Sequence, residues 1–383
     1  MAVVGTRLAG AALASGLVLL SSAAATPAAA SLAHPAAARP AGAQAAGRCC
    51  RNAPPWRGVT DFKLRHAGWF VDVEATSRNA AWAVGDTIST ETKAITGGVA
   101  ARWNGHRWYQ VALPLAAFVP VSVSASKGSS VWIFGYQSLP SADSSTVPAD
   151  ALVWTAGHWQ VLPLPTAGAE WDVLGDLQSA VFGDDDVWVT GNGHNSMGEV
   201  TGNIMWNWNG SGWTGYPLHV LGARNVSGSS GDNVWVAAQG AHGQTVALRW
   251  NGAAWRKVRV PYISDASVVA DSPRNVWLTG AGSQGDVTVG AVEHWNGNRW
   301  NRTKLDPVLN PNELASTDGR GGVWFSDFAH ESRGVWYVPT ALPSWHGCSF
   351  GLGAGMVAAI PGTSAAWFAG VCAGPAIAID GHI

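Results

Sequence analysis

From residue 56 onward the chain is a succession of short apolar runs interrupted by small polar residues. The runs are rich in β-branched and aromatic residues, and Gly, Asn, Asp, Ser and Pro lie between them. Such runs bounded by turn-forming residues are typical of β-strands, whereas an amphipathic helix places apolar residues every three or four positions. No helical periodicity of useful length occurs in this region, so the pattern predicts an all-β protein of many short strands.

A short motif with Trp at its second position recurs along the chain. It reads AWAVG at residues 81–85, VWIFG at 131–135 and VWVTG at 187–191, and related copies follow up to residue 370. Successive copies lie 50, 56, 47, 42, 47 and 43 residues apart, at Trp82, Trp132, Trp188, Trp235, Trp277, Trp324 and Trp367. This period is typical of one four-stranded blade of a β-propeller. The spacing therefore predicts seven blades, and we call these seven side chains the anchor tryptophans.

A second motif follows most copies of the first. It reads WNGHRW at residues 103–108, WNGSGW at 208–213, WNGAAW at 250–255 and WNGNRW at 295–300, with a looser copy, WTAGHW, at 154–159. Asn-Gly between two apolar runs indicates a β-hairpin, because both residues tolerate positive φ. The two Trp of each copy then lie on one face of the hairpin and can stack. Each blade is thus predicted to hold an inner strand A, a Trp-bearing strand B, and a C–D hairpin.

The two ends of the chain complement each other. The last repeat ends with an apolar run at residues 376–379 and has no strand D, whereas residues 56–62 (WRGVTDF) have no preceding strands and resemble residues 108–111 (WYQV). We infer that the N-terminal stretch supplies the missing outer strand, which leaves no exposed sheet edge. The predicted fold is therefore all-β, a seven-bladed β-propeller of four-stranded antiparallel blades, with the ring closed by the N-terminal strand.

These motifs resemble the repeats of kelch and galactose-oxidase-type propellers. They resemble still more the secreted Trp-rich propeller proteins of high-GC actinobacteria. The resemblance covers residues 56–383 and implies a propeller fold, but propellers host many unrelated activities. The sequence differs from true kelch repeats because a single Gly, such as Gly85 or Gly135, stands where kelch has a Gly-Gly pair.

The N-terminal residues have a different composition. Residues 1–30 contain one early Arg7, an apolar run from 8 to 20 and an Ala-rich stretch, which is the pattern of a secretory signal peptide. The run is too short for a membrane span of about 20 residues. Residues 31–48 are Ala, Pro and Gly-rich and read as a disordered linker, and residues 49–383 form the propeller domain. We therefore expect a secreted, extracellular protein.

The four cysteines fit that location. In a secreted chain an even count indicates disulfides, with three possible connectivities for Cys49, Cys50, Cys348 and Cys372. We favour cross-pairs that tie the N-terminus to the last blade. No CxxC spacing favours a metal site, and no metal or cofactor is predicted. Charged residues make up only 13% of the chain and the net charge is −2, so there is no basic footprint for nucleic acid.

The longest predicted loops join strand B to C and strand D to the next A, and both kinds lie on one face of a propeller. Binding residues commonly lie on such loops. The candidate ligand-binding residues are Asp86, Tyr136, Trp171, His194, His242, Asp327 and His330. The three histidines are either metal ligands or acid–base groups that converge on one site, or solvated loop residues spread around the ring.

No nucleophile or phosphate-loop motif occurs in the sequence. We therefore expect a non-catalytic module that binds an extracellular glycan or protein on this loop face. A hydrolase or lyase that uses His and carboxylate groups of the same face is the first alternative. An interaction platform without a small-molecule site is the second.

Overall fold

The computed structural model describes residues 50–53, 56–58, 62, 64, 66, 68–92, 94–137, 148–165, 173–194, 200–240, 244–284, 287–303, 315–326, 329–332, 335–339, 344–345, 348–349, 355–371 and 375–379. Every helix-or-strand element within these ranges is a β-strand, which confirms the all-β prediction. The described part of the chain contains no helix that is long and apolar enough to cross a membrane.

Most of the strands form four-stranded antiparallel sheets from consecutive segments. The first sheet holds β3 (Gly68–Ser77), β4 (Ala80–Ile88), β5 (Ile95–Trp103) and β6 (Trp108–Val111). The second holds β7 (Val119–Ala125), β8 (Val131–Tyr136), β9 (Ala149–Thr155) and β10 (His158–Pro163). The third holds β11 (Val173–Gly183), β12 (Asp186–His194), β13 (Val200–Trp208) and β14 (Trp213–Pro217).

The next sheets repeat this order. The fourth holds β15 (Gly222–Ser230), β16 (Asn233–Gln239), β17 (Thr245–Trp250) and β18 (Trp255–Val258). The fifth holds β19 (Ser264–Ser272), β20 (Asn275–Gln284), β21 (Val287–Trp295) and β22 (Trp300–Thr303). The sixth holds β23 (Ala315–Thr317), β24 (Val323–Phe325), β25 (His330–Ser332) and β26 (Val335–Pro339), and β1 (Cys50–Ala53) joins it beside β26 as a parallel fifth strand.

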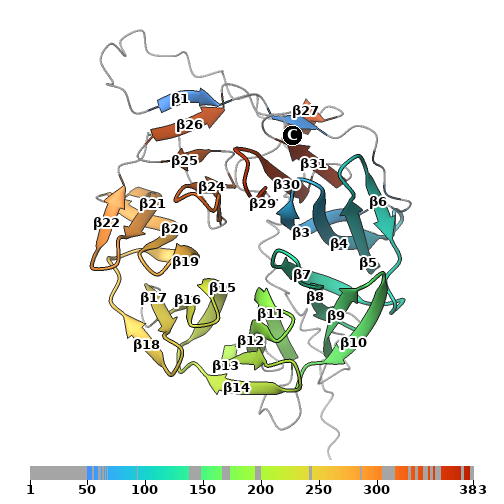
Figure 1. Ribbon diagram of the computed structural model, residues 1–383, viewed down its shortest axis with the longest axis horizontal. Coiled ribbons are helices and arrows are strands. Elements are labelled where there is room, and N and C mark those ends of the chain that lie inside the picture. The colour runs from blue at the N-terminus through green and yellow to red at the C-terminus, as the bar shows by residue number, and fades with distance from the viewer. Residues whose placement is uncertain are drawn as a thin grey trace, which may run out of the picture.

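The remaining C-terminal strands combine with an N-terminal one. β29 (Gly355–Ala359), β30 (Ala366–Val371) and β31 (Pro375–Ile379) form a sheet with β2 (Arg57–Gly58), which pairs antiparallel to β31. We call it the seventh sheet. A separate two-stranded sheet holds β27 (Ser344–Trp345) and β28 (Cys348–Ser349). The sheets are arranged around a common centre, with β3, β7, β11, β15, β19 and β29 toward the inside, as Figure 1 shows, which is the arrangement of a β-propeller.

Tryptophans fill the interfaces between neighbouring sheets. In the first four sheets and the seventh, the anchor Trp packs against both hairpin Trp of the next sheet, with ring centroids 4.9–6.3 Å apart. In the third and fourth sheets this group is Trp188 with Trp250 and Trp255. The same contact joins Trp367 of the seventh sheet to Trp103 and Trp108 of the first. The two sequence motifs are therefore the two halves of one repeated packing unit.

The hairpin turns have the predicted chemistry. In the fourth sheet Trp250 pairs directly with Trp255, and Gly252 between them has a φ of +87°. The Asn251 side chain accepts hydrogen bonds from the N–H groups of Ala253 and Ala254 at 3.1 and 3.0 Å. Asn closes the turn with its own side chain and Gly adopts the left-handed conformation, which is why the pair recurs.

The inner strands of the first five sheets each contain a β-bulge, which the sequence did not reveal. A polar residue at the bulge reaches the next sheet in two clear cases. One carboxylate oxygen of Asp72 accepts a hydrogen bond from Val123 N at 2.8 Å. The Asn225 side chain accepts from Val268 N and donates to Val268 O, both at 2.8 Å. These bonds satisfy backbone groups at the inner sheet edges that no neighbouring strand pairs with.

Candidate functional site

Three of the predicted ligand-binding residues are buried, and the first two are Asp86 and Tyr136. Asp86, near the end of β4, is 7% exposed, and Tyr136, at the end of β8, is 5% exposed. Burial raises the pKa of Asp86 to about 7, and a hydrogen bond from the Trp69 side chain opposes this shift. Both residues are therefore parts of the packed sheets and offer little surface to a ligand.

The other predicted residues are more scattered. His194 ends β12 and is half-buried. Trp171, His242 and Asp327 lie outside the described residues. Of the cysteines, Cys50 begins β1 and Cys348 begins β28, whereas Cys49 and Cys372 also lie outside the described residues. Within the described ranges no group of three or more His, Cys, Asp or Glu is placed to hold a metal ion.

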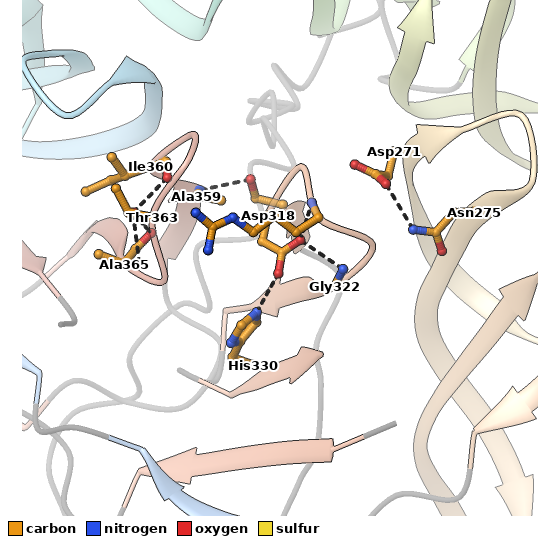
Figure 2. A network of polar contacts seen from close by, with 11 residues as sticks. Asp271, Asn275, Asp318, Gly322, His330, Ala359, Ile360, Thr363 and Ala365 are labelled. Carbon is orange, nitrogen blue, oxygen red and sulfur yellow. Dashed lines mark hydrogen bonds and ion pairs between the residues drawn. The ribbon is translucent and has the colours of Figure 1, made fainter. Parts of the chain in front are cut away.

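His330 lies in a strand and belongs to a buried polar network, shown in Figure 2. Its ring nitrogen Nε2 is 3.0 Å from a carboxylate oxygen of Asp318, and its ring stacks on Trp324 with centroids 4.2 Å apart. The other carboxylate oxygen of Asp318 accepts hydrogen bonds from the N–H groups of Arg320 and Gly322. Burial alone would raise the pKa of Asp318, but the hydrogen bonds from His330 and the backbone outweigh it and lower this pKa.

The position of His330 is one instance of a repeated arrangement. In the register of strands B and C, each anchor Trp of the first six sheets faces one residue of strand C, and these residues are Arg102, Val153, Asn207, Arg249, His294 and His330. Arg102 and Arg249 lie over their Trp rings at 5.7 and 5.3 Å, and His294 stacks at 4.1 Å. We call this strand C position the cover position, because in most sheets its side chain covers the anchor Trp.

The cover residues of the second and third sheets, Val153 and Asn207, are shorter than the Arg and His of the other sheets, and Asn207 is the polar one. Its side chain donates a hydrogen bond of 3.2 Å to Asp186 and does not extend over Trp188 as an arginine would. A cleft of about 300 Å³ opens here between the third and fourth sheets. We call it the 3–4 cleft, and its lining residues are Asp186, Trp188, Asn207, Tyr216, Ser230, Gly231, Asp232, Trp250 and Gly252.

Aromatic rings form one side of the 3–4 cleft. Tyr216 stacks on Trp188 with centroids 5.7 Å apart and planes at 28°, and it also contacts Trp250 at 5.1 Å. Trp188 is buried, whereas Tyr216 and Trp250 are half-buried. The aromatic cluster that holds the two sheets together therefore leaves part of its surface open at this interface.

Carboxylates and an amide form the polar side. One oxygen of Asp186 accepts hydrogen bonds from Trp188 Nε1 at 2.9 Å and from Asn207 Nδ2 at 3.2 Å. Burial raises the pKa of Asp186, the two hydrogen bonds lower it, and repulsion from Asp185 and Asp232 raises it further. The net direction is upward, so the negative charge of Asp186 is not fully compensated.

Two glycines of the fourth sheet shape the cleft. A Cβ on Gly231 would collide with the carboxylate of Asp186, so Gly231 allows this side chain to lie against the backbone of the neighbouring sheet. Gly231 and Asp232 belong to the turn between β15 and β16, and Gly252 belongs to the turn between β17 and β18. The cleft is therefore on the face of the A–B and C–D turns, opposite the loop face predicted from the sequence.

The turn between β11 and β12 holds Asp184 and Asp185. Asp184 accepts a hydrogen bond from Ser130 N at 2.7 Å, whereas Asp186 already begins β12. The one sequence signal that distinguishes the cleft is the residue before each Trp-Asn-Gly motif. This residue is Arg102, Arg249 or His294 in three of the repeats, but it is Asn207 in the repeat that forms the third sheet.

A second polar group lies on the inner strand β3. Asp72 uses its two carboxylate oxygens to accept hydrogen bonds from Val73 N and Val123 N, both at 2.8 Å. Burial raises its pKa to about 7, and burial together with repulsion from Asp72 raises the pKa of Glu74 to about 8. Both oxygens of Asp72 are therefore used by the backbone, one of them across the contact between the first and second sheets.

No protein-family model matches the sequence, and no curated protein has significant sequence similarity to it. Solved structures with a similar strand arrangement include a six-bladed fungal lectin from Aleuria aurantia that recognises fucose. It is 11% identical, the match covers 64% of this chain and 80% of the lectin, and the TM-score is 0.43. The SapL1 lectin, solved with α-methyl fucoside, is 14% identical over 72% of this chain and 99% of its own, with a TM-score of 0.47.

A GH74 xyloglucanase from Xanthomonas campestris is also similar. It is 14% identical, the match covers 83% of this chain and 52% of the enzyme, and the TM-score is 0.49. At these identities and TM-scores the similarity does not extend to individual residues of a site.

Proposed function

We propose that this protein is a non-catalytic binding module that recognises a carbohydrate in the 3–4 cleft. The main support for this proposal is that accessible aromatic surface and hydrogen-bonding groups occur together in one concave site. A sugar has apolar C–H faces that pack on aromatic rings and hydroxyl groups that need hydrogen-bond partners. Tyr216 and Trp250 offer the first kind of contact, and Asp186, Asn207 and Asp232 offer the second.

The volume of the cleft limits the size of the ligand that it can bind. Its volume of about 300 Å³ is at the lower end of the range for small-ligand sites, about 300–1,000 Å³. A terminal sugar unit fits such a site better than a long chain segment or a protein surface does. We therefore expect recognition of the end of a glycan.

The proposal includes seven blades closed into a ring by residues 56–58. It is supported by the pairing of β2 with β31 and by the edge-on contact of Trp56 with Trp324, at 5.9 Å. It is also supported by the contacts of Trp367 with Trp103 and Trp108. The resemblance to kelch-type and actinobacterial Trp-rich propellers remains part of the proposal and rests on the repeated motifs.

We also propose that the protein acts outside the cell after removal of a signal peptide within residues 1–30. Disulfides between the N-terminal Cys49 and Cys50 and the C-terminal Cys348 and Cys372 would then staple the ring. Mass spectrometry of the protein purified from culture medium, digested without reduction, tests both statements. Peptides linked between residues 49–50 and 348 or 372 are expected. Free thiols at all four positions would contradict the proposed disulfides.

The binding site is tested with an Asn207→Arg variant. Arg249 and Arg102 occupy the same cover position in other sheets, so the fold accommodates an arginine there. In the third sheet the new side chain is expected to extend over Trp188 and fill the cleft. We expect a glycan array to identify a sugar that binds the unmodified protein, and calorimetry to show at least tenfold weaker binding to the variant, about 1.4 kcal/mol.

The matched control is Gly212→Arg in the same hairpin. A Cβ on Gly212 meets open space, and other hairpins carry Arg107 and Arg299 at this position. The control adds the same charge outside the lining of the cleft, so its affinity should equal that of the unmodified protein. Equal affinity in both variants would place the sugar elsewhere, and no binding to any sugar would overturn the proposed function.

A further inference from the structure

The charge of the 3–4 cleft is unusual for this chain. Asp186 and Asp232 are its only charged lining residues, and none of the nine lining residues is Lys, Arg or His. Asp185, the neighbour of Asp186, adds a third carboxylate close by. The cleft therefore presents negative charge beside aromatic rings.

The next interface, between the fourth and fifth sheets, has the opposite charge at matching positions. Asn233 stands two residues before its anchor Trp, where the third sheet has Asp186, and the cover position holds Arg249 in place of Asn207. Arg274 contacts Gly297 as Asp232 contacts Gly252. The three residues Asn233, Arg249 and Arg274 thus carry two positive charges where the 3–4 cleft carries two negative ones.

This comparison identifies what the cleft lacks. In the fourth sheet the Asn233 side chain accepts hydrogen bonds from both its anchor Trp, at 3.2 Å, and the cationic Arg249, at 3.0 Å. In the third sheet Asp186 accepts from its anchor Trp and from the neutral amide of Asn207. Compared with the fourth sheet, the third sheet has the carboxylate of Asp186 in place of an amide and the amide of Asn207 in place of a cation. The cover position of the third sheet therefore supplies no positive partner to Asp186.

We infer that the 3–4 cleft selects a sugar that carries a protonated amine, such as a 2-amino-2-deoxyhexose with a free amino group, over its neutral or N-acetylated counterpart. This inference rests on the proposed function of the cleft. The ammonium group takes the place near Asp186 that a cationic side chain occupies beside Asn233. The sugar ring then lies against Tyr216 and Trp250.

Two physical effects favour the amine. Asp186 and Asp232 repel each other, and an ammonium group between them offsets that repulsion and pairs with the carboxylate of Asp186. An ammonium group near the faces of Trp and Tyr is also attracted by the negative faces of their ring quadrupoles. A neutral sugar gains neither contribution and leaves the two carboxylates opposed to each other.

The test compares glucosamine, N-acetylglucosamine and glucose, each as a methyl glycoside, by calorimetry at a slightly acidic pH that keeps the amine protonated. The unmodified protein is expected to bind the glucosamine glycoside at least tenfold more tightly than either of the others. The variant Asp186→Asn places in the third sheet the residue that Asn233 and Asn275 supply in others, so the fold is expected to tolerate it. A double variant, Asp186→Asn with Asp232→Asn, should bind all three glycosides with similar affinity.

Glu91→Gln is the matched control, because it removes one exposed carboxylate from the loop after β4, outside the lining of the cleft. It should keep the full preference for the amine. A preference that survives in the double variant would overturn the inference. Equal binding of all three glycosides by the unmodified protein, with loss of binding in Asn207→Arg, would overturn the inference and leave the proposed function standing. Failure of every sugar to bind would overturn both.

Discussion

Single residues at the cover position determine which side chain packs against the anchor Trp at each interface between sheets. Arg249 lies over Trp235 and His330 stacks on Trp324, whereas Asn207 donates a hydrogen bond to Asp186 and Tyr216 stacks on Trp188. The backbone register at these sites is the same, so the difference is one of side-chain length and charge. The 3–4 cleft combines a short cover residue with the carboxylates of Asp186 and Asp232.

Glu74 provides a prediction at this scale. Its pKa in the folded protein is raised from 4.5 to about 8 by burial and by the nearby Asp72. Between these pH values the folded protein holds a proton that the unfolded chain has released, so the free energy of unfolding falls as the pH rises through this range. We expect Glu74→Gln to make unfolding less dependent on pH and to raise stability at pH 8 by about 1–2 kcal/mol, after allowance for partial exposure.

Urea unfolding at pH 5 and pH 8 measures this effect. Gln keeps an oxygen that can accept the hydrogen bond from Ala75 N, so the substitution changes mainly the titration. The exposed Glu91→Gln variant should retain the pH dependence of the unmodified protein. The same pH dependence in Glu74→Gln would show that Glu74 titrates normally.

Asp318 changes the pH dependence of stability in the opposite direction. Hydrogen bonds from His330 and from the Arg320 and Gly322 N–H groups lower its pKa below the ordinary 3.8, despite burial. Its contribution to stability is therefore fully present above that value and is lost as the pH falls through the lower folded-state pKa. We expect Asp318→Asn to lower the melting temperature at neutral pH, by a free-energy change of about 1–3 kcal/mol. We also expect the difference between the proteins to shrink in strong acid, and a constant difference at every pH would contradict this.

At the scale of elements, the hairpin sequences specify most of the local structure. Each Trp-Asn-Gly turn places two Trp side by side, and the pair then receives the anchor Trp of the preceding sheet. The turn residues and the packing residues are thus specified within the same six positions. This consistency between local turn chemistry and inter-sheet packing is what makes the repeat recognisable in the sequence.

Gly252→Ala tests the turn requirement. The φ of +87° is disfavoured for alanine, and its Cβ would press against the Asp232 side chain. We expect destabilisation of about 1–2 kcal/mol, measured as a fall in melting temperature. Gly212→Ala is the matched control, because it lies in an equivalent hairpin with open space at the Cβ and without a positive φ. Equal effects of the two substitutions would refute the role of the left-handed turn.

At the scale of the whole molecule, Trp56 contacts two sheets formed by the other end of the chain. Trp56 is 4% exposed and packs edge-on against Trp324 of the sixth sheet and Phe368 of the seventh. A side chain more than three hundred positions away from Phe368 thus fills the interface that the hairpin Trp fill elsewhere. Closure of the ring by the N-terminal strand, as proposed, would make this contact a determinant of global stability.

Trp56→Ala tests that role. We expect a loss of about 3–5 kcal/mol, as for other large-to-small substitutions in a core, seen in denaturant unfolding. Tyr262→Ala removes an aromatic side chain that is 63% exposed and should change stability by no more than about 0.5 kcal/mol. A loss as small for Trp56 as for Tyr262 would mean that the N-terminal strand contributes little to the ring.

The sequence by itself determined the all-β class, the hairpins and the tryptophan pairs, because strand periodicity and Asn-Gly turn chemistry are local properties of a few consecutive residues. It also pointed to the pairing of residues 57–58 with the C-terminal run, since the two ends lack complementary strands. The tertiary structure alone decided that Asp86, Tyr136 and His330 are buried, and that Asp72 and Asn225 connect neighbouring sheets. It also decided that a cleft lies where Asp186 and Asn207 of one sheet meet Asp232 and Trp250 of the next. Such a site depends on the distance between side chains of different repeats, which the order of residues along one repeat does not contain.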